Sequence, residues 1–471
     1  MFRQSATKLF SPLRRRTFPS YSFCSQVHDD LGIRSTGTSM VKPSSPTPRH
    51  LAEFKLSLID NYVPPLYTAF IFFYPGGGGG GGGGEGVLGV LKSSLAQALT
   101  RFYPLAGRLS RSGGPDSIPI IRCDDEGVPF ATAVAGPSSM DRLLSRPPEI
   151  DALHRFLPFR PCLVGTPAGL ESAPQLAVKA TVFPCGGVAV GVCFLHKIGD
   201  GYTISSFLKL WAALARGGGD EQEVGGGGAA YAHDRAAASL FPARHEDALP
   251  AARDFIYEGG EGAETERTTV ARRFVFDREA VAKLKLGARS EWVPNPTRFE
   301  AVSGLLWKSA VSATATALAL DGKAGSVPGG APRFSDAAAG GAQREELDRG
   351  ARRVLHAEAG SRRREGRVSR NEATRTEMLA RAGRSGRSKV AYFVMSSTFG
   401  MDVYGVDFGW GKPAWVSLAE LPDEMNNVVG LINGPDGAGV EAWIFMHERE
   451  LSILEEDPEI LAYAKNNPSV L

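Results

Sequence analysis

Residues 188–217 read VAVGVCFLHKIGDGYTISSFLKLWAALARG. Large apolar and small residues alternate from 188 to 194, which is the pattern of a buried strand. From residue 204 onward the apolar residues recur at i, i+3 and i+4, the spacing of one helical face. His196 and Asp200 stand between the two segments, and glycines flank the aspartate. The stretch therefore predicts a strand, a glycine-hinged turn and a helix, with His196 at the end of the strand.

The turn allows two interpretations of His196. A histidine at this place can face a cleft, and with an ordinary pKa of about 6.5 it can accept a proton at neutral pH. The alternative is a histidine that only completes the turn. Asp200 also has two candidate roles: it can orient the imidazole, or it can pair with an arginine and hold the turn in shape. The chain has no HExxH and no G-x-S-x-G motif, which argues against a zinc site and a serine nucleophile.

The composition is that of a globular protein of two or more domains. The chain has 471 residues, of which 43% are hydrophobic and 22% charged. A formal net charge of +2 gives no general indication of a nucleic acid or a membrane surface as partner, and no apolar run is long enough to span a bilayer. The five cysteines form no CxxC pair, which favours a reducing compartment and argues against a disulfide framework or a structural zinc site.

The pattern changes along the chain predict four parts. Residues 1–29 carry arginines and serines and no acidic residue before Asp29, so we expect a disordered tail or an organellar targeting segment. Residues 30–216 form the first predicted domain. Residues 217–268 are rich in glycine, alanine and charge and are expected to be a crossover linker. Residues 269–471 form the second predicted domain.

One segment of the second domain does not fit a packed structure. Residues 331–388 contain fourteen arginines but only seven large apolar residues. Such a segment buries too little surface to offset its chain entropy. Three interpretations are a basic nucleic-acid-binding arm, a disordered insert, and a reading-frame error in the gene sequence. We favour the third, and we expect a verified transcript to read the same bases in another frame; a transcript that encodes these arginines would contradict it.

A second motif, DFGWG, occupies positions 407 to 411. Glycines on both sides of Trp410 favour a tight turn at a strand edge, and Asp407 can pair with an arginine. The motif shares three letters with the DFG motif of kinases, but no HRD motif or kinase-type glycine-rich loop precedes it. We therefore expect a structural role for this turn.

Together the motifs resemble those of the BAHD family of plant acyl-CoA-dependent acyltransferases. Residues 196–201, HKIGDG, match the family's HxxxDG, and residues 407–411 match its DFGWG, which is followed by Lys412 and Pro413. The likeness extends to further stretches, namely VKPSSPTPRHLAEFKLSLID (41–60), FYPLAGRL (102–109), PTRFEAVSGLLWKSA (296–310) and NPSVL (467–471).

The resemblance implies an α/β fold of two similar chloramphenicol-acetyltransferase-like domains, with mixed sheets and a solvent channel between them. It implies that His196 is the general base: it deprotonates a hydroxyl or amine acceptor, which attacks the thioester of acyl-CoA directly. It further implies that Asp200 supports the catalytic turn by pairing with Arg298. The motif residues Asp407, Phe408, Gly409, Trp410 and Gly411 are implied to be structural.

The resemblance also implies the partners. Acyl-CoA is the co-substrate, a plant specialised metabolite with a hydroxyl or amine group is the acceptor, and neither a metal nor another cofactor is required. We expect a monomer in the cytoplasm that binds neither nucleic acid nor membrane, with organellar targeting by residues 1–29 as an alternative.

Some positions depart from the family pattern. Aligned on the DFGWG motif, Ser396 and Ser397 match serines near the expected oxyanion and are candidate substrate-binding residues. Thr398, however, stands where relatives often have tryptophan, and Gly400 stands where arginine is frequent. The alternative to an enzyme is therefore a catalytically impaired remnant of the same fold that acts at most as a binding protein.

Overall fold

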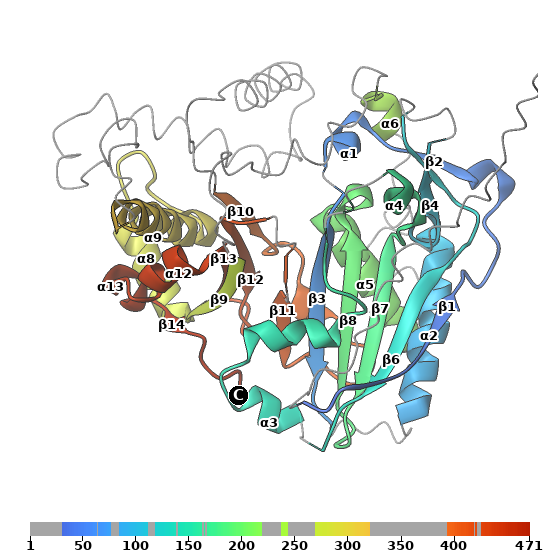
Figure 1. Ribbon diagram of the computed structural model, residues 1–471, viewed down its shortest axis with the longest axis horizontal. Coiled ribbons are helices and arrows are strands. Elements are labelled where there is room, and N and C mark those ends of the chain that lie inside the picture. The colour runs from blue at the N-terminus through green and yellow to red at the C-terminus, as the bar shows by residue number, and fades with distance from the viewer. Residues whose placement is uncertain are drawn as a thin grey trace, which may run out of the picture.

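The computed structural model describes most of both predicted domains. The described residues are 31–63, 65–76, 84–111, 118–137, 140–162, 164, 167–218, 237–243, 269–320, 393–418, 420–421 and 425–471. The predictions made for residues 1–29 and 331–388, and for most of the linker 217–268, lie outside these residues. The architecture is α/β with mixed sheets, as the sequence predicted. Figure 1 shows the six-stranded and the five-stranded sheet side by side.

The larger sheet has six strands in the order β1-β6-β7-β8-β3-β11. Its β6 and β7 pair in parallel and its other neighbours pair antiparallel. The central strand β8 is buried at every position because the sheet is covered on both faces. The bounds of the strands are β1 (Arg34–Val41), β3 (Tyr67–Tyr74), β6 (Val128–Val134), β7 (Leu176–Val182), β8 (Val188–Leu195) and β11 (Trp415–Leu418).

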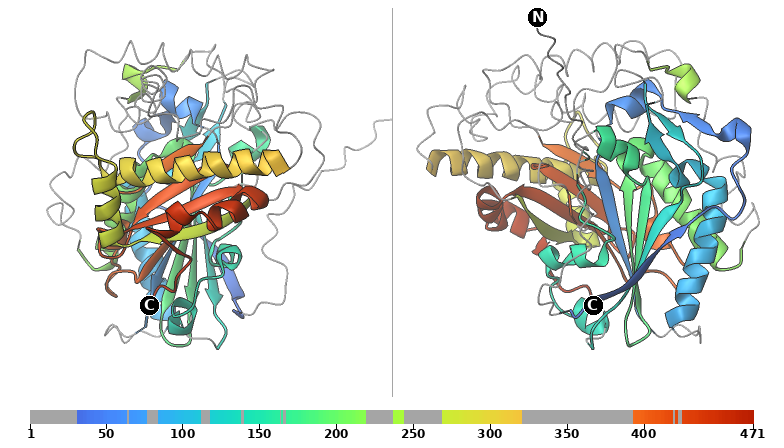
Figure 2. Two further views of the ribbon diagram at one scale, coloured as in Figure 1. Left: turned by 90° about the vertical axis from the view of Figure 1, so that its left-hand side faces the viewer. Right: turned by 45° about the vertical axis from the view of Figure 1, so that its right-hand side comes forward.

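Two helices, α2 (Gly84–Arg101) and α5 (Gly201–Ala215), pack together over one face of this sheet (Figure 2). The indole Nε1 of Trp211 donates to the carbonyl oxygen of Leu91 at 3.1 Å and so joins them. The 3₁₀ helix η3 (Ile150–Phe156) packs against β8 elsewhere on the sheet. A side chain at Gly191 of β8 would place its Cβ 2.1 Å from the carbonyl oxygen of Phe156, so glycine is required for this approach.

Shorter elements surround the larger sheet. A three-stranded sheet has the order β2-β5-β4. Its strands and the neighbouring helices are β2 (Glu53–Lys55), β4 (Arg108–Ser110), β5 (Ile120–Arg122), η1 (Arg49–Leu51), α1 (Leu58–Tyr62), η2 (Tyr103–Ala106), α3 (Met140–Leu144), α4 (Pro167–Ser172) and α6 (Ala237–Leu240).

The second sheet has the order β10-β12-β13-β9-β14, with β10 parallel to β12 and the remaining pairs antiparallel. Figure 2 shows helices α9 and α12 in front of it, and their apolar side chains share one core with β9, β12 and β13. The bounds are β9 (Thr269–Phe276), α8 (Arg278–Gly287), α9 (Arg298–Leu320), β10 (Val394–Ser397), η7 (Val403–Gly405), β12 (Val428–Asn433), β13 (Val440–His447), α12 (Glu448–Glu455), α13 (Pro458–Leu461) and β14 (Lys465–Asn466).

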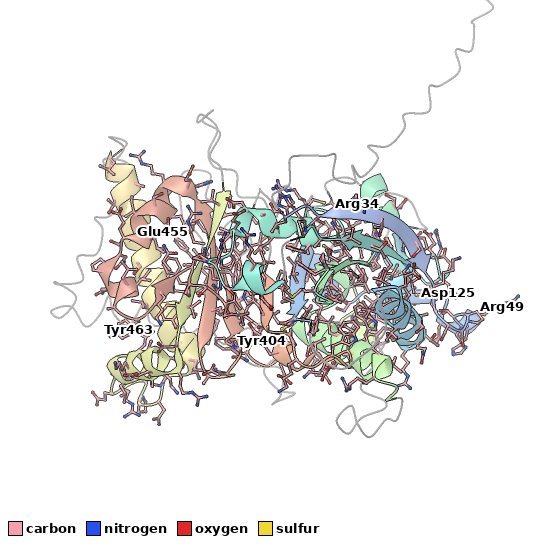
Figure 3. All side chains as sticks on the ribbon, turned by 90° about the horizontal axis from the view of Figure 1, so that it is seen from below. Arg34, Arg49, Asp125, Tyr404, Glu455 and Tyr463 are labelled. Carbon is pink, nitrogen blue, oxygen red and sulfur yellow. The ribbon has the colours of Figure 1, made fainter. Side chains whose placement is uncertain are left out.

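Strand β11 connects the two halves. It comes from the second predicted domain, yet it pairs with β3 at the edge of the larger sheet, with Trp415 opposite Phe73. Trp415 stacks on Phe73 at 5.2 Å and on Trp443 of β13 at 6.0 Å, so the two sheets share a continuous aromatic contact. Figure 3, seen from below, places Tyr404 between the half with Glu455 and Tyr463 and the half with Arg34 and Arg49. One strand of the larger sheet thus comes from the second predicted domain.

Candidate functional site

The main chain of His196 is fixed from both sides. Strand β8 ends at Leu195, and His196 opens the 3₁₀ turn η4 (His196–Ile198), as the sequence predicted. The amide of Leu195 donates to the carbonyl of Gln175 at 2.9 Å, and the amide of His196 donates to the carbonyl of Leu66 at 2.8 Å. His196 is therefore held between the segments that lead into the two neighbouring strands, β7 and β3.

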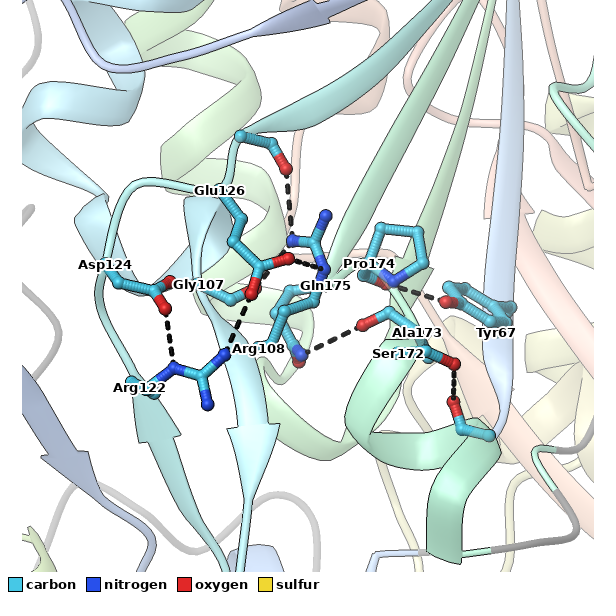
Figure 4. A network of polar contacts seen from close by, with 12 residues as sticks. Tyr67, Gly107, Arg108, Arg122, Asp124, Glu126, Ser172, Ala173, Pro174 and Gln175 are labelled. Carbon is cyan, nitrogen blue, oxygen red and sulfur yellow. Dashed lines mark hydrogen bonds and ion pairs between the residues drawn. The ribbon is translucent and has the colours of Figure 1, made fainter. Parts of the chain in front are cut away.

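Side-chain contacts stabilise these flanking segments (Figure 4). The hydroxyl of Tyr67, the first residue of β3, donates to the carbonyl of Pro174 at 2.6 Å, and the amide side chain of Gln175 donates to the carbonyl of Ala173 at 3.4 Å. Arg108 belongs to the neighbouring network and donates to the carbonyl of Gly107 at 2.8 Å, while burial lowers the pKa of its guanidinium. The strand end beneath His196 is thus a rigid support.

The imidazole of His196 is half-buried. Its Nδ1 atom is buried and has no hydrogen-bond partner among the described residues. Within the described ranges no carboxylate therefore orients the ring through Nδ1, in contrast to the histidine of a hydrolase triad. Of the two roles considered for Asp200, the geometry excludes the triad role in this structure.

Asp200 is the N-cap of α5. One of its carboxylate oxygens accepts a hydrogen bond from the amide of Thr203 at 2.8 Å, which satisfies one of the free donors at the start of the helix. Asp200 therefore holds the turn in shape through the helix cap. The helix cap differs from the arginine pairing that was expected, and the support of a catalytic turn by Asp200 stays a prediction.

The expected ion pair between Asp200 and Arg298 is not formed in the described part of the chain, and this prediction is corrected. Arg298 donates to the carbonyls of Gly437 at 2.7 Å and Ala438 at 3.3 Å, and its guanidinium lies 4.9 Å from the ring centre of Phe399. The carboxylate of Asp200 is occupied by the helix cap, and Arg298 is occupied by the turn between β12 and β13.

Asp200 and Arg298 are instead related through the segment Phe399–Met401. Arg298 lies on Phe399 at one end of this segment. At its other end the carbonyl of Met401 accepts a hydrogen bond from Ser205 of α5 at 2.7 Å. Gly201 lies against the same methionine, since a Cβ there would be 3.0 Å from its Cε atom. The turn that carries His196 in the first half therefore abuts the second half.

The two candidate serines lie on β10, the edge strand that leads into this segment. Ser396 is exposed and Ser397 is half-buried. The next residue, Thr398, is buried, and its hydroxyl has no hydrogen-bond partner among the described residues. The structure thus brings the end of β10 toward the start of α5, and the role of the serines in substrate binding stays a prediction.

The DFGWG motif forms a tight turn, as predicted. The carboxylate of Asp407 accepts from the amides of Gly409 at 2.7 Å and Gly411 at 3.0 Å, and both glycines have positive φ, +102° and +92°. Arg216, the C-cap residue of α5, donates to the backbone carbonyl of Asp407 and not to its carboxylate. Both glycines adopt a conformation that other residues rarely take.

The aromatic residues of the motif dock on the larger sheet and on α5. Phe408 is buried and meets Trp211 edge-on at a centroid distance of 4.8 Å. Trp410 meets Tyr74 of β3 at 5.6 Å, and the hydroxyl of Tyr74 donates to the carbonyl of Val406 at 2.7 Å. Burial, and secondly Asp407, raise the pKa of this tyrosine well above its usual value. These contacts join the DFGWG turn to β3 and α5, and the structural role of the motif stays a prediction.

Sequence reasoning missed Lys197, Tyr67 and Met401, all of which contact the turn or its support. Only Lys197 left a signal, because a lysine two residues after the end of a buried strand and directly before an apolar residue has few ways to reach solvent. In the described residues, no group of three or more histidine, cysteine or acidic side chains is placed to hold a metal ion. No helix in the described ranges is long and apolar enough to cross a bilayer.

Comparison with known proteins decides the family. The profile of the Transferase family matches residues 31–321 and 334–461. A BAHD acyltransferase of Arabidopsis thaliana, BIA1, is 32% identical over 93% of this chain and 99% of its own length. The chain belongs to the BAHD acyltransferase family. It is accordingly an acyl-CoA-dependent acyltransferase, and the resemblance stated from the two motifs is confirmed.

Other BAHD relatives match the chain over nearly its whole length. Akuammiline synthase 2 of Alstonia scholaris is 33% identical over 93% of this chain and 98% of its own. A limonoid 21-O-acetyltransferase of Melia azedarach is 31% identical over 94% of this chain and 100% of its own. Among solved structures, vinorine synthase is similar with a TM-score of 0.68 and 25% identity, over 93% of this chain and 100% of its own. The last match supports the fold class of two chloramphenicol-acetyltransferase-like domains.

Proposed function

We propose that this BAHD protein transfers an acyl group from acyl-CoA to a hydroxyl group of a small plant specialised metabolite, with His196 as general base. The observation that carries this proposal is the half-buried imidazole of His196, held at a strand end by main-chain bonds on both sides. The names of relatives such as limonoid 21-O-acetyltransferase support a hydroxyl over an amine as acceptor. As part of the proposal, the protein acts as a cytoplasmic monomer without metal or other cofactor.

The chemistry needs one proton acceptor. Nδ1 of His196 is buried, so the other ring nitrogen, Nε2, takes the proton from the acceptor hydroxyl. The oxygen then attacks the thioester carbonyl and the carbon–sulfur bond breaks. The imidazolium returns the proton to the departing thiolate of CoA, so that the ester and free CoA thiol are the products. General-base assistance of this kind is worth about 10²–10⁴-fold in rate.

The other residues are proposed to support this step. Asp200 holds the turn through the helix cap, and Gly201 lets Met401 approach the start of α5. Asp407, Phe408 and Trp410 dock the DFGWG turn on β3 and α5. Ser396 and Ser397 are proposed to contact the substrates near the developing oxyanion.

The test is release of CoA thiol by the purified full-length chain. Acetyl-, malonyl- and hydroxycinnamoyl-CoA are each combined with a panel of hydroxylated and amine acceptors, and ester products are identified by mass spectrometry. The proposal predicts acceptor-dependent thiol release with at least one donor. Tight binding of acyl-CoA by calorimetry, without turnover on any acceptor, would favour the alternative of a catalytically impaired binding protein.

A further inference from the structure

Lys197 is a buried cation beside the candidate base. Its side chain is only 1% exposed. Its Nζ atom donates to three main-chain carbonyls, those of Asp60 at 3.0 Å, Asn61 at 3.1 Å and Val63 at 3.2 Å. These carbonyls lie in the last residues of α1 and at its C-cap, where a helix leaves acceptors unsatisfied. An ammonium has three N–H donors, so every donor of Lys197 has an acceptor.

The segment that Lys197 holds is the one that also holds His196. After α1 the chain leads to Leu66, whose carbonyl accepts the hydrogen bond from the amide of His196 at 2.8 Å. Two consecutive residues of the turn therefore bind this part of the chain. Lys197 binds the end of α1 through its side chain, and His196 binds Leu66 through its main chain. At its N-terminus α1 has a capping box between Ser57 and Asp60, which stabilises this end of the helix.

We propose that Lys197 is a positioning residue for His196, and that its charged form, by tying α1 to the catalytic turn, sets the orientation of the imidazole. This inference rests on the proposed function of His196. It follows from the lack of a partner at Nδ1, since a ring without that hydrogen bond takes its orientation from its main chain and from packing. Lys197 is the side chain that fixes the main chain on the α1 side of this turn.

The protonation state of Lys197 matters because a neutral amine has only two N–H donors. On deprotonation one of the three carbonyls loses its donor and faces a lone pair. Burial lowers the pKa of Lys197 to about 8, while Asp60 of α1 raises the pKa and Arg111, next to β4, lowers it. The grip on α1 is thus complete below pH 8 and weakens above it, so that kcat should fall on the alkaline side with a midpoint near this value.

The experiment compares Lys197→Met with Lys179→Met. Lys179 of β7 donates to the backbone carbonyl of Arg155 at 2.5 Å, away from the catalytic turn, so the control also removes a lysine bonded to main chain. With an aliphatic alcohol acceptor, Lys197→Met should lower kcat by about ten- to a hundredfold, as expected for a misplaced base, with a change of KM for acyl-CoA below about threefold. It should also abolish the alkaline limb near pH 8, and Lys179→Met should keep that limb and the wild-type kcat.

A second readout needs no turnover. The rate of carbethoxylation of His196 by diethyl pyrocarbonate, followed by mass spectrometry of its peptide, should change several-fold in Lys197→Met and not in Lys179→Met. If the wild-type chain has no transferase activity, the proposed function fails while this readout still tests the positioning. Unchanged reactivity of His196 and an unchanged alkaline limb in folded Lys197→Met would overturn the inference. If that variant does not fold, a wild-type kcat that stays level from pH 7 to pH 9.5 would overturn it.

Discussion

His196 has a main chain fixed by hydrogen bonds and an Nδ1 atom without a partner among the described residues. The neighbouring residues Asp200 and Lys197 bind other parts of the chain and not the ring. Asp200 does not touch the ring; its carboxylate caps α5 through the amide of Thr203. Lys197 does not touch the ring either, and it binds the carbonyls of α1. Under the proposal made above, both residues act on the imidazole through the backbone of the turn.

The cap role of Asp200 makes a prediction that separates it from an ion pair. Asp200→Ala should lower the free energy of unfolding by about 0.5–2 kcal/mol, because the first turn of α5 loses an acceptor. Asp200→Asn keeps an acceptor oxygen and should restore most of that stability, although it removes the charge. Urea unfolding of both variants gives the answer. An Asp200→Asn variant as unstable as Asp200→Ala would show that the charge matters and that the cap account is wrong.

The buried charge of Lys197 makes stability depend on pH. The pKa of a lysine in an unfolded chain is about 10.4, whereas burial lowers that of Lys197 to about 8 in the folded protein. Between these values the unfolded state binds more protons, so the contribution of Lys197 to stability rises with pH, by up to about 3 kcal/mol in total. Below pH 8 Lys197 is protonated in both states, so this pH-dependent gain is absent although the three hydrogen bonds to α1 are complete.

The measurement is the free energy of unfolding of the wild type minus that of Lys197→Met, from pH 7 to pH 10. Burial also raises the pKa values of Cys193 and Tyr74, but both proteins contain these residues, so their effects cancel in the difference. The difference should increase with pH above 8. Parallel curves for the two proteins would mean that Lys197 titrates normally in the folded state.

At the scale of elements, the stretch from β8 to α5 was the most predictable part of the fold. Alternation over 188–194 and helical spacing from 204 onward predicted both elements to within three residues, because each pattern reflects local burial. The glycines of DFGWG predicted a turn because glycine readily adopts the positive φ that a tight turn needs. The pairing of Asp200 was not predictable, since a carboxylate at a helix start can serve either a cap or a distant arginine.

Gly191 illustrates a requirement of the contact between β8 and η3. Gly191→Ala would place a Cβ 2.1 Å from the backbone oxygen of Phe156, and neither strand nor 3₁₀ helix can move freely. We expect a loss of about 3 kcal/mol or more in the free energy of unfolding. The matched control is Gly89→Ala in α2, where nothing lies within 4 Å, and there the change should stabilise by about 0.5–1 kcal/mol. Equal thermal shifts for the two variants would contradict the close approach.

At the scale of the whole molecule, the two halves are joined by strand β11, whereas the sequence suggested a simple division at the linker 217–268. Strand β11 was not predictable as part of the first sheet, because its partner β3 lies more than three hundred residues earlier and no local pattern records such a pairing. Behind β11, Arg273 and Glu441 form an ion pair at 2.7 Å with both side chains 3% exposed, and Trp415 donates to the same carboxylate at 3.2 Å.

This buried pair should contribute strongly to the junction of the halves. Glu441→Gln leaves the guanidinium of Arg273 buried without a counter-charge, so we expect a loss of about 3–5 kcal/mol in the free energy of unfolding. Glu279→Gln removes the exposed ion pair with Lys283, and it should leave the free energy of unfolding almost unchanged because solvent screens this pair. Differential scanning calorimetry of both variants checks the contrast. A Glu441→Gln variant as stable as Glu279→Gln would show that the buried pair does not stabilise the junction.

The central claim is that the imidazole of His196 takes the acceptor's proton, and single-turnover kinetics of His196→Ala test it most directly. The matched control is His154→Ala on η3, a histidine whose Nδ1 pairs with the backbone carbonyl of Asp151. We predict that His196→Ala slows release of CoA thiol by about 10²–10⁴-fold while it stays folded, and that His154→Ala keeps the wild-type rate. A folded His196→Ala variant that transfers the acyl group within about threefold of the wild-type rate would contradict the claim.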